Sequence, residues 1–116
     1  MVLRVTLISA EDDSDLVVSF GLEPSAATSL TVMRSPQYEH LLANEDRGAT
    51  IARSSDPSPE PLFLTSVDWV GDTLQIEAAN RKYTLDLSKV DAIEIADAKR
   101  IIRLMNSDGR FKCNVA

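Results

Sequence analysis

The sequence holds only one histidine and one cysteine, which excludes most sites that carry out chemistry. A tetrahedral zinc site needs several such ligands at short spacing. Nucleophilic catalysis needs a base beside the nucleophile, and His40 lies among solvent-type residues. Cys113 is typical of a small core residue and has no second cysteine with which to form a disulfide. We therefore expect a protein that is not an enzyme and that uses no metal and no cofactor.

Clustered glycines and long apolar runs are missing as well. The four glycines lie far apart, so they cannot form a phosphate-binding loop. No apolar run approaches the roughly 18 to 20 residues of a membrane helix, and no basic segment followed by an apolar stretch opens the chain. Together with a lone cysteine, which is typical of a reducing compartment, these absences predict a cytoplasmic protein.

Positive charge is scarce in the first half of the chain. Residues 1–60 carry ten acidic side chains against four arginines, whereas residues 61–116 carry eight charges of each sign. The net charge of −6 therefore arises entirely from the first half. Such a surface repels nucleic acid and anionic lipid and attracts a basic protein, so we expect neither nucleic acid nor membrane as a partner. An acidic excess that serves solubility alone is the alternative.

The 116 residues fit a single domain of ordinary globular composition, spanning 1–116. Apolar and polar residues alternate over 2–8, 16–22, 30–34, 63–69, 73–78 and 82–87, which predicts strands, and 49–53 and 111–115 are weaker strand candidates. In the first strand the alternation places Leu3, Val5 and Leu7 on one side. Turns are expected at 24–28, at the proline-rich segment 54–61 and at 79–81.

Two segments predict helices. Ser35-Pro36 is a typical helix start, and Tyr38, Leu41 and Leu42 follow at helical spacing, which predicts one or two turns. A longer helix begins near Asp91, which together with Glu94 forms a capping-box pattern. One apolar stripe then runs along this second helix through Ile95, Ala98, Ile101, Ile102 and Met105.

These elements predict an α+β fold. It consists of a twisted antiparallel sheet of about six or seven strands, packed by the C-terminal helix, with one short helix between strands. Antiparallel pairing is expected because the turns are short and local. Trp69 alternates in step with Val67, which favours a place in the core, although tryptophan is also enriched at binding hot spots.

The most acidic segment, Glu11-Asp12-Asp13-Ser14-Asp15, separates the first two predicted strands. A calcium-binding EF-hand loop needs glycine at its sixth position and glutamate at its twelfth, but Leu16 and Leu22 stand there. Two interpretations remain for the segment. It is either a solvated hairpin turn or a patch that binds a partner.

The order of elements resembles the small immunity proteins encoded beside bacterial polymorphic toxins. The resemblance rests on four segments: Leu16-Val17-Val18-Ser19-Phe20-Gly21, Leu30-Thr31-Val32-Met33-Arg34-Ser35, the hairpin from Trp69 to Ile76, and the tail from Leu104-Met105-Asn106 to Phe111. It spans about residues 3–115. It looks like the subgroup of that family in which a strand ending in a Gln-Arg-Ser-type motif precedes an acidic segment. This chain has Met33 in place of the glutamine.

This resemblance implies stoichiometric inhibition of a cognate toxin domain, which the acidic bias predicts to be basic. The partner would face an acidic surface made from either of two groups, namely Glu11, Asp12, Asp13 and Asp15, or Glu39, Glu45 and Asp46. Two other classes stay open. One is a non-catalytic β-rich adaptor similar to pleckstrin-homology modules, and the other is a homo-oligomeric structural protein, such as a homodimer joined at an exposed sheet edge.

Overall fold

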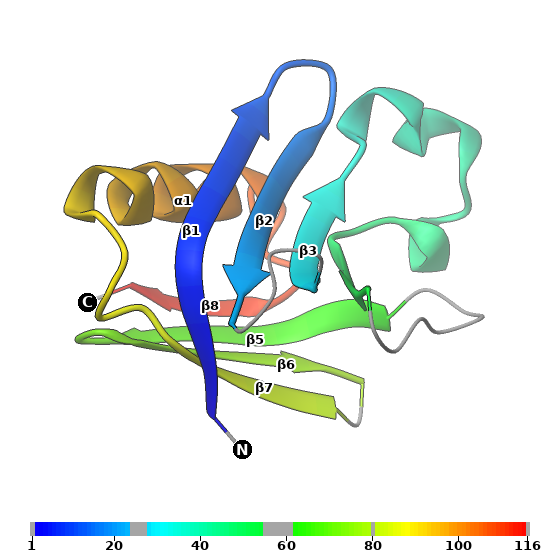
Figure 1. Ribbon diagram of the computed structural model, residues 1–116. Helices are drawn as coiled ribbons and strands as arrows, with labels where there is room; N and C mark the ends of the chain where they lie inside the picture. The colour runs from blue at the N-terminus through cyan, green and yellow to red at the C-terminus, as the bar shows by residue number, and fades with distance from the viewer. Residues whose placement is uncertain (1, 24–27, 55–61, 80, 116) are drawn as a thin grey trace.

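The computed structural model describes residues 2–23, 28–54, 62–79 and 81–115. The chain adopts an α+β fold in which eight strands form a mostly antiparallel mixed sheet and one α-helix packs on it (Figure 1). In chain order the elements are β1 (Val2–Asp12), β2 (Leu16–Leu22), β3 (Ser29–Arg34), the 3-10 helices η1 (Pro36–Leu41) and η2 (Asn44–Asp46), β4 (Thr50–Arg53), β5 (Leu62–Val70), β6 (Thr73–Ala78), β7 (Arg81–Asp86), α1 (Ala92–Met105) and β8 (Lys112–Val115). The α+β class and the C-terminal helix are confirmed.

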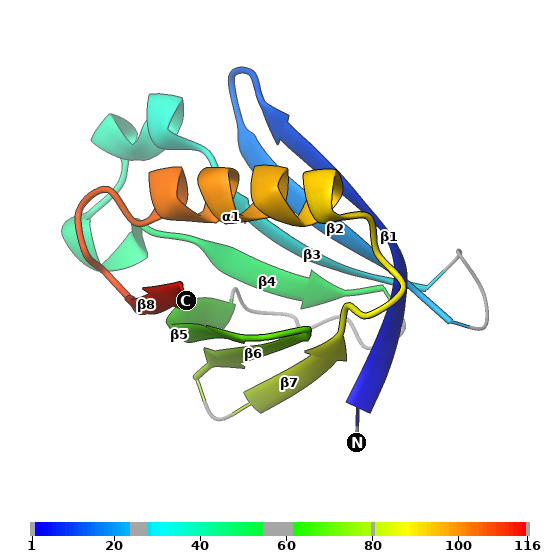
Figure 2. The ribbon, with the colours of Figure 1, turned by 90° about the vertical axis from the view of Figure 1, so that its left-hand side faces the viewer.

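The sheet consists of two meanders joined side by side, the first made of β1–β4 and the second of β5–β7. Its strand order is β4-β3-β2-β1-β7-β6-β5-β8, and β4 also pairs with β5. The β4–β5 pairing joins one end of the strand order to the strand next to its other end, so the sheet curls round the core (Figure 2). Two pairings, β1 with β7 and β5 with β8, are parallel. The predicted antiparallel pairing is confirmed for the strands that local turns join, and the two parallel pairs were not predicted because they join segments that are distant in the sequence.

Helix α1 lies across the open side between the two meanders, and it contacts β1 and β2 (Figure 2). The predicted stripe is confirmed, since Ala98, Ile101, Ile102 and Met105 are buried. Asp91 caps the helix by accepting a hydrogen bond from the Ile93 amide at 2.8 Å.

The predicted capping box is only half present. The Glu94 side chain turns to β1, where it accepts a hydrogen bond from the amide of Ile8 at 3.1 Å. β1 has left β7 by this point in the sequence, because their pairing ends at Arg4. The helix therefore supplies an acceptor to a strand edge that would otherwise lie open.

Two bulges alter the alternation that the sequence predicts. The β1–β2 register shifts between Val5 and Leu7, so Ile8 enters the core and Leu7 is 47% exposed. Placing Leu7 with Leu3 and Val5 was therefore wrong. A second shift lies between Leu64 and Ser66 of β5. Beyond it Trp69 is 1% exposed, so its predicted place in the core is confirmed.

The turns predicted at 24–28 and 54–61 lie almost wholly outside the described residues, and Asn80 lies outside them too. No helix in the described part of the chain is long and apolar enough to cross a membrane.

Candidate protein-binding surface

The acidic segment forms the tip of the β1–β2 hairpin, at the top of Figure 1, where η1 stands beside it. The side-chain amide of Gln37 in η1 donates a hydrogen bond to Asp15 Oδ1 over 3.4 Å. Glu11 and Asp13 are exposed and form no ion pair with another described residue. We call Glu11, Asp13 and Asp15 the acidic tip.

Asp12 belongs to the same hairpin, but its charge is balanced from the helix. Arg100 donates to Asp12 Oδ2 at 2.8 Å and also binds Asp97 at 2.7 Å. The hydrogen bond from Arg100 holds the pKa of Asp12 below its usual value. Asp12 therefore anchors the hairpin to α1 and adds little net charge to the acidic tip.

The second predicted group of acids is divided by the structure. Glu39 is half-buried and paired with Arg34, whereas Glu45 and Asp46 are exposed on η2 and form no ion pair within the described residues. Glu39 thus has a structural partner, and Glu45 and Asp46 remain available to a binding partner.

Arg34 ends β3 and is the one charged residue that is buried among those described, at 6% exposed. Its guanidinium binds both carboxylate oxygens of Glu39, at 2.8 and 2.7 Å, and both of Asp108, at 2.8 Å each. It also donates to the carbonyl of Met105, the last residue of α1. Paired two-point contacts of this kind are the strongest that arginine makes with carboxylates. Arg34 therefore ties η1 to the end of the helix.

A second arginine extends this network to η2. Arg110 donates to Asp108 at 2.7 Å, and its other nitrogens reach the carbonyl and the side chain of Asn44 at 2.8 and 2.6 Å. Glu39 also accepts a hydrogen bond from the Gly48 amide at 3.2 Å. We call Arg34, Glu39, Asp108 and Arg110 the Arg34 network. It fixes both 3-10 helices against the C-terminal part of the fold.

The Arg34 network predicts a loss of stability in acid. Hydrogen bonding to Arg34 holds the pKa of Glu39 and of Asp108 below their ordinary values. A carboxyl with a lowered pKa in the folded protein stabilises it fully above the unfolded-state pKa of about 4, and less as the pH falls through the folded value. The free energy of unfolding, measured with urea, is therefore expected to decrease as the pH is lowered below about 4.

The variant Arg34→Met isolates this effect, because Asp12 and Asp86, whose pKa values are also lowered, are unchanged in it. Its stability should fall less steeply with acid than that of the wild type. Equal slopes for the two proteins would show that the network does not cause the loss.

Three apolar side chains of and just after η1, the helix that contacts the acidic tip through Gln37, are exposed to solvent. Tyr38 is 57% exposed, Leu41 is 73% exposed and Leu42 is 43% exposed, and no residue of η1 is buried. The helical spacing of these residues was predicted, but their exposure was not. An exposed aromatic and aliphatic group with charges at its border is typical of a protein-binding surface. We call these residues the apolar trio.

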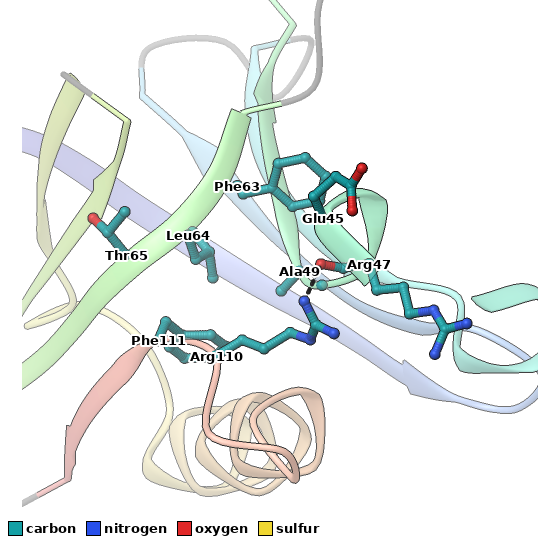
Figure 3. A pocket seen from close by; sticks show the side chains of 9 residues that line it. Glu45, Arg47, Ala49, Phe63, Leu64, Thr65, Arg110 and Phe111 are labelled. Atoms are coloured by element: carbon teal, nitrogen blue, oxygen red, sulfur yellow. Dashed lines mark hydrogen bonds between the residues drawn. The ribbon is translucent and has the colours of Figure 1, made fainter. Parts of the chain in front are cut away.

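A pocket of about 330 Å³ lies on the β4 side of η2 (Figure 3). Phe63, Leu64 and Phe111 supply its apolar walls, and Glu45 stands at its border. Arg110 crosses it and donates to the carbonyl of Arg47, so its guanidinium is already occupied. Within the described residues, no group of three or more histidine, cysteine or acidic side chains could hold a metal ion.

Comparison with protein-family models gives no match, and comparisons with curated proteins and with solved structures give none either. The case for a function therefore rests on the surface itself.

Proposed function

We propose that this protein is an immunity-type inhibitor that acts in the cytoplasm by binding a cognate protein toxin domain with a basic surface. The observation that carries the proposal is the joint position of the acidic tip and the apolar trio at one end of the molecule. Acids without internal partners attract a basic surface at long range, and exposed apolar side chains hold it once water is excluded.

The mechanism is occlusion. The hairpin and η1 project beyond the sheet, so they can enter a cleft in a partner without rearrangement of the core (Figure 1). Asp12 ties the hairpin to α1 through a surface ion pair with Arg100, and the buried Arg34 holds η1 through the Arg34 network. A surface that is held in its binding conformation loses less conformational entropy when it binds.

The order of elements favours a second candidate. A four-strand meander, a three-strand meander and a C-terminal helix also describe a pleckstrin-homology-like adaptor, which would bind a peptide rather than inhibit a toxin. The two functions differ in the partner that they require. A toxin domain harms a cell that expresses it without this protein, whereas a peptide-containing partner of an adaptor does not.

The test is a pull-down from a lysate of the source organism with three baits: wild type, Leu41→Asp and Ile93→Asp. Leu41 belongs to the apolar trio, whereas Ile93 is 79% exposed at the far end of α1 and serves as the matched control. We expect wild type and Ile93→Asp to capture one basic protein and Leu41→Asp to lose it. The captured protein should arrest growth when expressed alone and be harmless when co-expressed with the wild type.

Either of two results would contradict the proposal. One is a partner that all three baits retain equally, since it would bind elsewhere. The other is a captured protein whose expression alone does not affect growth, which would favour the adaptor function.

A further inference from the structure

The pocket of Figure 3 lies where two neighbours of β5 leave a gap. On the side of β5 away from β6, β4 pairs with Leu62 and Phe63, and β8 pairs from Ser66 onward. Leu64 and Thr65 lie between these two pairings and line the pocket. The gap between the pairings therefore explains why the surface is hollow at this point.

The walls of this pocket are held in place by contacts within the fold. Gly48 has a φ of +136°, and a β-carbon there would lie 3.4 Å from Phe63 Cδ1 and 3.5 Å from Arg110 Cδ, so its backbone packs between these two side chains. Arg110 in turn binds the carbonyl and the side chain of Asn44 on η2 at 2.8 and 2.6 Å. A pocket that is formed in advance loses less conformational entropy when it is filled.

Glu45 supplies the charge that this pocket offers to a ligand. It is exposed on η2 and forms no hydrogen bond or ion pair with another described residue. Arg110 is already paired with Asp108 at 2.7 Å. Arg47 points its guanidinium away from the aromatic walls and donates to the carbonyl of Leu42 at 3.1 and 2.9 Å (Figure 3). The unpaired carboxylate therefore favours a cationic ligand.

The apolar walls select the kind of cation. Phe63 is partly exposed, and Leu64 and Phe111 behind it are 4% and 5% exposed. A guanidinium stacks its planar face on an aromatic ring while its nitrogens reach a carboxylate, and the aliphatic stem of arginine covers apolar surface. A lysine ammonium is more strongly hydrated and does not stack in this way. The combination of ring, apolar wall and carboxylate thus suits an arginine side chain.

We propose that this pocket takes an arginine side chain of the basic partner, with the guanidinium on Phe63 and Glu45. Glu45 follows Leu42 of the apolar trio by three residues, so their α-carbons are at most about 11 Å apart. A partner seated on the apolar trio is therefore within reach of the pocket. The arginine belongs to the partner of the proposed function, so its assignment rests on that function.

Titration of the isotope-labelled protein with Nα-acetyl-L-arginine methyl ester, followed by amide NMR, tests the pocket without the partner. The blocked ends leave the guanidinium as the only charge of this probe. Nα-acetyl-L-citrulline methyl ester has the same stem and no charge, so it is the matched neutral probe. We expect saturable shifts at Gly48 and Leu64 with the arginine probe. The citrulline probe should bind with a Kd at least about fivefold higher, because it lacks both the ion pair and the cation–π contact.

Two variants test the role of Glu45 in binding the arginine probe. Glu45→Gln and Asp46→Asn each remove one negative charge from η2, but Asp46 does not line the pocket. Glu45→Gln should raise the Kd about twofold to fivefold, and Asp46→Asn should leave it nearly unchanged. The amide spectra of the two variants also show whether each is folded.

Three results would each overturn the arginine site. They are equal Kd values for the two probes, equal Kd values for the two variants, and no saturable shift at the residues that line the pocket. The pull-down with Leu41→Asp does not involve this pocket, so a failed titration leaves the proposed function standing. A captured partner that is not toxic contradicts that function, and the titration still decides whether the pocket binds arginine.

Discussion

Replacing Arg34 with methionine is expected to lower the free energy of unfolding by about 3 to 5 kcal/mol. Arg34 is buried, and the side chain of Glu39 is only 14% exposed. Among the described residues, Arg34 is the only cation that forms a hydrogen bond or ion pair with Glu39. The substitution therefore leaves a mostly buried carboxylate without its counter-charge. Urea unfolding at neutral pH, followed by circular dichroism, measures the change.

The surface arginine Arg100 provides the matched control. It also binds two carboxylates, Asp12 and Asp97, but its side chain is 52% exposed. Arg100→Met is expected to lower the free energy of unfolding much less than Arg34→Met does, since solvent screens exposed pairs. The double variant Arg34→Met with Glu39→Gln should recover part of the loss, because it removes the stranded charge. An Arg34→Met protein as stable as Arg100→Met would show that the network has no structural role.

Reversing the charge of the acidic tip, through Glu11→Lys, Asp13→Lys and Asp15→Lys, is expected to slow association with the partner about tenfold to a hundredfold at low ionic strength. Long-range attraction by these acids raises the rate at which the two proteins meet, and dissolved salt screens this attraction. The difference between the triple variant and the wild type should therefore shrink as salt is added. Stopped-flow mixing with the captured partner gives the association rate.

A second triple variant separates local charge from net charge. It carries Asp68→Lys on β5, Asp72→Lys in the β5–β6 turn and Glu77→Lys on β6. These elements lie away from the β1–β2 hairpin (Figure 1). Both triples bring the formal net charge from −6 to zero. Only the variant of the acidic tip should associate slowly. Equal slowing by both would show that the partner responds to the total charge and not to this surface.

The local elements of the fold could be predicted from the sequence, and their long-range pairing could not. Alternation located β2 and the β5–β6 hairpin because one side of each strand is buried, as at Val18 and Phe20. The pairings β1–β7 and β5–β8 join segments with no short turn between them, so no local pattern marks them. The two bulges were missed for a related reason, since an extra residue in a strand has no composition of its own.

The candidate surface divides in the same way. Exposed acids in a short turn, such as Asp13, follow from sequence because no nearby residue could pair with them. Glu39 was grouped with the exposed acids although Arg34 lies only five positions before it, because Arg34 is held in place by Met105 and Asp108, which lie 71 and 74 positions beyond it. Exposure of Leu41 was missed because helical spacing usually marks a buried stripe, whereas a single 3-10 segment is too short to bury a face.

The parallel pairing of β1 with β7 sets the order in which this protein can complete its fold during synthesis. Val2 pairs with Thr84, so most of the chain must leave the ribosome before β1 acquires its second neighbour. Glu94, which later caps the amide of Ile8, is translated after that. The first meander therefore leaves the ribosome with the edge of β1 unpaired. During this interval chaperones can bind the exposed edge. Closure waits for contacts distant in sequence, which form slowly.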